Sequence, residues 1–292
     1  MLTVCAIVLD YFGYDKTVTC LSSLRDQGLD TVLVVYNSGD ATANQKLDEA
    51  LQGFMQKEPS FHLHRLINRR NLGFAKGVNG ALRWLEKNHP HRFYLLMNND
   101  AEAAPGMVKE LLRYAEDHPG TRLLAPIIMT ETHPVEYLWY QRLSGLLIFK
   151  PFSGFFPFLS GCCLLVDRRL LRDRLFDEDF FMYGEDVELG WRLRREKIEF
   201  TCVQTAKVLH EVTGSSRQGE LFYEYYMVLG HLLLARKLSR HSWEIPLLLA
   251  GRFLALSLRA AVRVFRFRSL NPAKAFLRAW YNYVKKQDPH NR

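Results

Sequence analysis

Two adjacent acids, Glu185 and Asp186, stand where a stretch rich in acids and aromatics passes into a helical pattern. Leu189 and Leu193 lie four residues apart with charged residues between and after them, which predicts a short amphipathic helix beginning near Glu185. In the first turn of a helix the dipole favours an ionised, mildly basic carboxylate. Such a group suits a hydroxyl that loses its proton as it forms a bond, although acids in a first turn are also ordinary capping residues.

The residues around this acid pair resemble the acidic motif of the inverting family 2 glycosyltransferases, especially of the rhamnosyltransferase-like branch. In that motif Phe-Asp-Glu, two aromatic residues, Glu-Asp and a downstream Arg recur, and residues 176–192 match it. The resemblance implies that Asp186 is the catalytic base and that Glu185 orients the site or holds the acceptor. It also implies contacts to the acceptor or its sugar from Tyr183, Trp191 and Arg192.

Three further segments resemble motifs of this family, in the family's order. Residues 70–79 are similar to its Asn-x-Gly-Phe-Ala segment, and residues 94–100 to its strand ending in a metal-binding acid. Residues 208–210, followed by Gly and Ser at 214–216, are similar to its late histidine motif. One such match would be a weak signal, but four in order over roughly the first 220 residues are specific.

On the donor side, the resemblance makes Asp100 the leading ligand for Mg²⁺ or Mn²⁺. A hard carboxylate suits these ions, and the ion can bridge to a diphosphate that departs with negative charge. His210 is expected to complete the metal shell or to hydrogen-bond the diphosphate. Spacing alone favours a turn residue and a structural histidine, so both roles depend on the family match. The implied donor-binding residues are Asp10, Asn37, Asp40, Arg70, Asn71, Gly73, Phe74, Asn79, Asn98, Asn99 and Asp100.

One part of the family pattern is missing. The family has Asp-Asn-x-Ser after the second strand, with the acid contacting the nucleobase, but residues 34–40 lack that Asp. Three replacements stay open: Tyr36 could stack on the base, Asp40 could substitute through a shifted loop, and Asp10 could supply the carboxylate. The missing acid also favours an alternative class, a non-catalytic sugar-nucleotide-binding or membrane-associated scaffold protein. The presence of Asp186 and Asp100 argues against that alternative.

Alternating strand and helix patterns must position these residues. They predict an α/β fold with a mostly parallel central sheet flanked by helices on both faces. The loops at the carboxyl ends of the strands should line one crevice. The resemblance implies the nucleotide-diphospho-sugar transferase (GT-A) fold for residues 1–220. The expected strands are 3–10, 31–36, 61–67 and 92–97, the expected helices 15–27, 41–57, 73–88 and 105–117, and residues 134–150 a variable connection.

The composition agrees with a folded enzyme. Of 292 residues, 48% are hydrophobic and 24% charged, which is typical of a globular protein. The five cysteines lack metal-ligand spacing and indicate reduced thiols without disulfides. The N-terminus reads as a buried strand and not as a signal peptide, so we expect a cytoplasmic protein.

Residues 221–292 are expected to form a basic amphipathic helical extension. From Arg236 onward there are 13 basic and two acidic residues, whereas the preceding chain has 26 basic and 29 acidic ones. The apolar stretch 245–267 contains four arginines, so we do not expect it to cross a membrane. Arginines among apolar residues suit helices lying on an anionic membrane surface, here the inner face of the cell membrane; plain packing on the catalytic domain is the alternative. No nucleic-acid-binding motif accompanies the charge, and no nucleic acid partner is expected.

Taken together, these features predict an inverting glycosyltransferase. The donor would be a nucleotide-diphospho-sugar carrying rhamnose or a related deoxysugar, and the acceptor a glycan or lipid-linked glycan. The sugar would move in a single displacement, in which Asp186 takes the proton of the attacking hydroxyl. Asp100, His210 and the cation would stabilise the leaving diphosphate.

Overall fold

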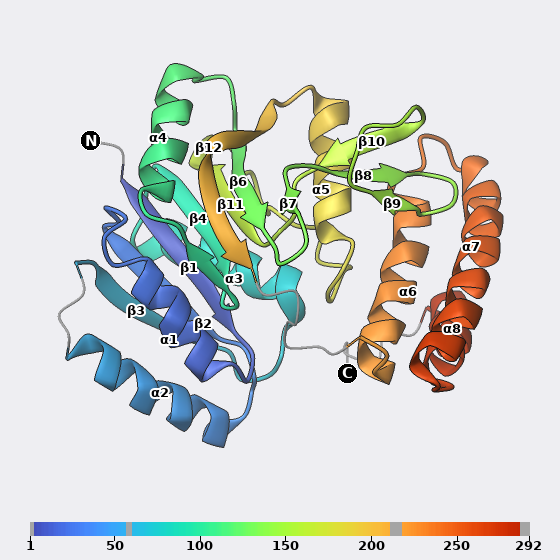
Figure 1. Ribbon diagram of the computed structural model, residues 1–292, viewed down its shortest axis with the longest axis horizontal. Coiled ribbons are helices and arrows are strands. Elements are labelled where there is room, and N and C mark those ends of the chain that lie inside the picture. The colour runs from blue at the N-terminus through green and yellow to red at the C-terminus, as the bar shows by residue number, and fades with distance from the viewer. Residues whose placement is uncertain (1–2, 57–59, 211–217, 287–292) are drawn as a thin grey trace.

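The computed structural model describes residues 3–56, 60–210 and 218–286. A large sheet with its covering helices occupies one side of the molecule, and a layer of three C-terminal helices stands on the other (Figure 1). Residues 214–216, which belong to the late histidine motif, lie outside the described residues.

The central sheet has the strand order β3-β2-β1-β4-β11-β6-β12-β5, with the short β7 paired to β6. Strands β5, β7 and β11 are antiparallel to their neighbours and the others share one direction, as predicted for a mostly parallel sheet. The strands are β1 (Val4–Asp10), β2 (Thr31–Tyr36), β3 (His62–Ile67), β4 (Phe93–Asn98), β5 (Ala101–Ala103), β6 (Leu123–Met129), β7 (Pro134–Val135), β11 (Cys163–Asp167) and β12 (Phe200–His210).

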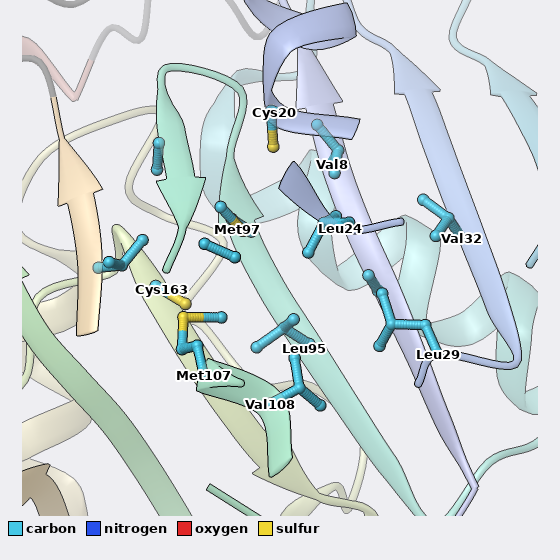
Figure 2. Close-up of a cluster of buried hydrophobic side chains, with 14 of the residues drawn as sticks. Val8, Cys20, Leu24, Leu29, Val32, Leu95, Met97, Met107, Val108 and Cys163 are labelled. Atoms are coloured by element: carbon cyan, nitrogen blue, oxygen red, sulfur yellow. The ribbon is translucent and has the colours of Figure 1, made fainter. Parts of the chain in front are cut away.

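Alternate side chains of the buried strands enter two apolar clusters on opposite faces of this sheet, because successive residues of a strand point to opposite sides. One cluster packs against α1, α2 and α4, and Figure 2 shows part of it. The other packs against α3 and α5. All five cysteines are buried free thiols, as expected. The five helices are α1 (Tyr14–Ser23), α2 (Ala41–Met55), α3 (Gly73–Asn88), α4 (Met107–Asp117) and α5 (Glu185–Glu196).

A second, three-stranded sheet has the order β10-β8-β9, and β8 and β9 lie where the sequence indicated only a variable connection. Its strands pair antiparallel, and Tyr140, Phe156 and Phe158 are buried against α5 and α6 (Leu221–Lys237). The short η1 (Arg168–Leu170) follows β11. The strands are β8 (Leu138–Gln141), β9 (Leu147–Ile148) and β10 (Phe155–Phe158).

The C-terminal extension consists of α6 (Leu221–Lys237), α7 (Glu244–Phe267) and α8 (Asn271–Lys285). Helix α6 is buried between the catalytic region and the other two, and Phe181 stacks on Tyr226 with ring centroids 4.8 Å apart. Helix α7 is long and apolar enough to cross a membrane by length and composition alone, even with its arginines. Only 22% of its most apolar stretch is buried within the fold.

Candidate active site

A cavity of about 400 Å³ lies at the carboxyl ends of the parallel strands, where they meet the start of α5 and one side of α6. The structure thus brings together segments that are far apart in the sequence, as expected for the crevice of an open α/β sheet. The predicted site residues that line this cavity are Asn37, Asn71, Gly73, Phe74, Asn98, Asn99, Asp100, Tyr183, Glu185, Asp186 and His210.

Asp100 and His210 meet in this cavity because β12 pairs with β5 just beyond Asp100. The imidazole Nε2 lies 3.2 Å from the Asp100 carboxylate, and both side chains are largely buried. Burial disfavours the charged imidazole, but hydrogen bonds to Asp100 and Cys162 outweigh it and raise the pKa of His210 to about 10. The carboxylate therefore stabilises a positive charge at this point.

A divalent cation fits the same pair. Asp100 offers a hard oxygen and His210, once a cation displaces its proton, a nitrogen, a mixed donor set that suits Mn²⁺ better than Mg²⁺. Within the described residues no cluster of three or more histidine, cysteine or acidic side chains could hold a metal. A bound diphosphate and water would supply further oxygen ligands.

Asp186 lies in the first turn of α5, where the sequence placed it. Its carboxylate accepts hydrogen bonds from the backbone N–H of Val187 at 2.8 Å and of Gly161 at 3.4 Å. Gly184 begins this helix at φ 104°, and a Cβ there would lie 2.9 Å from the ring of Phe180. The entry into the helix therefore requires glycine.

Burial governs the ionisation of the two acids more than the helix dipole does. It raises the pKa of Glu185, and the negative charge of Asp186 raises it further. Burial also raises the pKa of Asp186, against the opposing hydrogen bonds from Val187 and Gly161. Asp186 is therefore more basic than the helix dipole alone would make it, and the raised pKa makes it a better proton acceptor near neutral pH.

The loop before α3 is tied both to β2 and to the acidic motif. Asn37 Nδ2 donates to the carbonyl of Gly73 at 3.1 Å and to Asn71 Oδ1 at 3.2 Å. The backbone N–H of Phe74 donates to the carbonyl of Phe181 at 2.7 Å. Gly73 has φ 76°, and a Cβ there would lie 2.2 Å from the Phe181 carbonyl oxygen. The donor-side loop and the acid-bearing loop therefore hold each other in place.

Comparison with known proteins decides the family. The model of "Glycosyl transferase family 2" matches residues 6–175, more than half of the chain. This protein is a family 2 glycosyltransferase. It is an inverting enzyme that takes its sugar from a nucleotide-sugar. It is 28% identical over 239 residues to the N-acetylglucosaminyl-diphospho-decaprenol L-rhamnosyltransferase of Mycobacterium tuberculosis, covering 70% of this chain and 76% of that one. It is 23% identical to the low-salt glycan biosynthesis hexosyltransferase Agl10 of Haloferax volcanii, over 59% of this chain and 60% of that one.

Solved structures share the glycosyltransferase's GT-A fold. The mannosyltransferase PcManGT of Pyrobaculum calidifontis, in complex with GDP-Man and Mn²⁺, has a TM-score of 0.59 at 14% identity, covering 98% of this chain and 88% of that one. GalNAc-T7 with UDP, GalNAc and Mn²⁺ has a TM-score of 0.61 at 12% identity over 81% of this chain. This chain spans about half of GalNAc-T7, 48% of its length.

None of the three candidates for nucleobase contact lines the glycosyltransferase's cavity. Tyr36 is fully buried, and its hydroxyl donates to Asp48 at 2.7 Å, on the side of α2. Asp40 is exposed and caps the N-terminus of α2. Asp10 is buried and accepts a hydrogen bond from Thr17 at 2.6 Å. Asp10 also accepts a 3.4 Å hydrogen bond from Asn99, which lines the cavity. Asp10 therefore positions the Asn99 amide without lining the cavity itself.

Other predicted residues support the site from outside it. Asn79 is buried and binds the backbone of Leu175 and Phe176, which fixes the start of the acidic motif on α3. Trp191 packs on Phe156, and Arg192 pairs with the glutamate one turn earlier, because both leave α5 on faces other than that of Asp186. The predicted residues outside the cavity lining are Asp10, Asp40, Arg70, Asn79, Trp191 and Arg192.

The sequence analysis did not identify several cavity residues. Tyr11 follows β1 directly, and its position at a strand end was a usable signal. Cys162 lines the cavity beside His210, whereas the sequence indicated only that it is one of five reduced thiols. Tyr223 comes from α6, in the extension, where no motif pointed to the site.

We predict that Glu185→Gln flattens the pH dependence of stability. The pKa of Glu185 is raised in the folded state. Its contribution to the free energy of unfolding is therefore fully present below about pH 4.3, the ordinary glutamate pKa, and is lost as the pH rises through neutrality. The wild-type free energy of unfolding should fall over that window by about 2 kcal/mol more than that of the variant. Urea denaturation at pH 5 and pH 8 measures this.

Glu196→Gln, an exposed change on the same helix, is the matched control and should keep the wild-type slope. If the free energy of unfolding changed equally with pH in Glu185→Gln and wild type, the surroundings of Glu185 would not disfavour its ionised form.

Proposed function

We propose that this glycosyltransferase moves rhamnose or a related deoxysugar from a nucleotide-diphospho-sugar to a glycan or lipid-linked glycan. The observation that carries the proposal is a single cavity lined by both Asp186 and the Asp100–His210 pair. The similarity to a rhamnosyltransferase acting on a decaprenol-linked sugar supports the sugar and the kind of acceptor.

In the proposed reaction, Asp186 accepts the proton of an acceptor hydroxyl while the oxygen bonds to the anomeric carbon. The bond from that carbon to the diphosphate breaks in the same step, and the nucleoside diphosphate leaves from the opposite face. Glu185, whose pKa is raised by burial and by the charge of Asp186, keeps its proton and can donate a hydrogen bond to the acceptor. Tyr183, which also lines the cavity, is the proposed acceptor contact.

The leaving diphosphate needs positive charge beside it. Asp100 and His210 would hold Mn²⁺ or Mg²⁺, which when bound supplies that charge. The amides of Asn37, Asn71 and Asn99 lie in the cavity wall and would bind the donor's hydroxyls or phosphates.

We further propose that the enzyme works in the cytoplasm, at the inner face of the cell membrane. Three of the four arginines of α7 turn inward: Arg252 is fully buried, and Arg259 and Arg263 pair with Glu224. The outer face of α7 is left apolar, whereas basic residues of α8 remain exposed beside apolar ones. This combination suits insertion into the interface of an anionic bilayer. The exposed apolar residues are Leu247, Phe253, Leu254, Leu258, Val262 and Phe265 on α7, and Leu277, Tyr281 and Val284 on α8.

A panel of nucleotide-sugars, including dTDP-rhamnose, tests the reaction with Mn²⁺ and a short polyprenyl-diphospho-N-acetylglucosamine as acceptor. We expect release of nucleoside diphosphate from a deoxysugar donor and a product of inverted anomeric configuration by NMR. Turnover confined to ordinary hexose donors would overturn the choice of sugar.

Asp186→Asn should lower kcat about 10²- to 10⁴-fold, because the amide cannot accept the hydroxyl proton. Donor affinity, measured by titration calorimetry, should change little. Asp173→Asn, an exposed acid outside the cavity, is the control and should retain full activity. A kcat of Asp186→Asn within a few-fold of wild type would remove Asp186 as the base.

The double variant Leu254→Glu/Leu258→Glu should reduce flotation with anionic liposomes at least about tenfold, since both leucines are largely exposed and would lose their apolar burial in the bilayer. Binding of the wild type should largely persist in high salt, because the contact is mainly apolar. Met55→Glu, on the exposed side of α2, is the control. Undiminished flotation of the double variant would show that α7 does not face the lipid.

A further inference from the structure

A second cavity, of about 450 Å³, adjoins the first at the acid pair. Its walls are the small sheet, the start of α5 and one face of α6. Tyr183, Glu185, Asp186 and Tyr223 line both cavities. The proton acceptor of the proposed reaction therefore stands at the junction of two spaces, of which the first contains the Asp100–His210 pair.

Most of the second cavity's wall is apolar. Leu138, Phe158, Met227 and Leu234 contribute side chains to it, and Leu146, which is 57% exposed, stands at its edge. Such a lining suits an apolar ligand and offers few partners for the hydroxyls of a free sugar.

One basic side chain lines this cavity and a second lies next to it. Arg259 is in the wall, and its partner Glu224 is shared with Arg263. Arg252 lies seven residues before Arg259 on α7, on the same inward side, and it is fully buried. Arg259 and Arg263 thus share one carboxylate, and Arg252 adds a third guanidinium group on the same side of α7.

Arg252 has no carboxylate partner among the described residues. Its Nη1 lies 3.5 Å from the Leu248 carbonyl, its guanidinium also interacts with the Tyr140 side chain, and its Nε and Nη2 have no acceptor within hydrogen-bonding distance in the described chain. A buried, unpaired guanidinium is costly unless an anion completes it.

The groups around Arg252 belong to the second cavity. Tyr140 and His231 line it, and the Tyr140 hydroxyl lies 2.7 Å from His231 Nδ1. Burial, together with the positive charges of Arg252 and Arg259, lowers the pKa of His231 to about 3. The histidine is thus neutral, and the field at this end of the cavity is positive.

We infer that the second cavity is the acceptor subsite and that it takes an apolar chain bearing a phosphate or diphosphate, with Arg252 and Arg259 binding the phosphate. The inference deepens the proposed function and rests on it. An acceptor held here presents its hydroxyl to Asp186 from the side opposite the donor cavity. The same helix that supplies the two arginines presents its apolar outer face to the proposed membrane, from which such an acceptor would come.

The binding of farnesyl diphosphate, measured by titration calorimetry without divalent metal, tests this. Farnesol and inorganic diphosphate are the comparison ligands, and both should bind at least about tenfold more weakly. Arg252→Met should weaken farnesyl diphosphate binding at least about tenfold, with partial recovery in Arg252→Lys. Met227→Trp fills the cavity without altering the arginines, and it should also weaken farnesyl diphosphate binding.

Three matched variants should bind farnesyl diphosphate like wild type: Arg172→Met and Met55→Trp on the surface, and His210→Gln in the donor cavity. Binding that is lost in His210→Gln and kept in Arg252→Met would place the diphosphate on the donor side and overturn the inference. Equal affinity for farnesol and farnesyl diphosphate would remove the phosphate contact. The assay measures binding and not turnover. These outcomes can therefore be interpreted even if the proposed sugar transfer is wrong.

Discussion

The site depends on a close backbone contact at two glycines. The acid-bearing loop 180–184 passes between α3 and α6, and at Gly73 and Gly230 a Cβ would lie 2.2 Å and 2.3 Å from the carbonyl oxygens of Phe181 and Tyr183. Any side chain at either glycine would push the loop away. Because α5 begins at the end of this loop, the contact fixes where Asp186 stands relative to the donor-side loop. It also makes α6 part of the catalytic wall, although α6 belongs to the extension by sequence.

Desolvation determines the charge state of the acids held there. The helix dipole acts only on the first turn and contributes about 1 kcal/mol, whereas removing a carboxylate from water costs several. Two acids in adjacent positions cannot both ionise readily, and Glu185 has an oxygen without a hydrogen-bond partner in the described chain. The two acids therefore have different roles: Glu185 keeps its proton, and Asp186 is available to accept one.

The sequence was a good guide to the parts governed by local pattern. Strand and helix periodicity predicted the parallel core, and the motif residues around Asn71, Asp100, Asp186 and His210 do line one cavity. The chemical type of a residue was less informative than its position. The side chains of Asp10, Asp40 and Tyr36 are all of types that can contact a nucleobase, but their hydrogen bonds hold them away from the cavity. The three short strands β8 to β10 escaped prediction because each has two to four residues, and β8 and β10 are stabilised by packing on α5 and α6.

The C-terminal extension shows why a charge count does not describe a surface. Arg252, Arg259 and Arg263 recur at helical spacing and fall on the inner side of α7, while Leu254, Leu258, Val262 and Phe265 fall on the outer side. Glu224, the one fully buried acid among the described residues of the extension, holds two of these arginines against α6. Most of the basic character of α7 thus faces the protein, and the side turned to solvent is the apolar one. One helix therefore offers an apolar face outward and a positive one inward, toward the acid pair that the two cavities share.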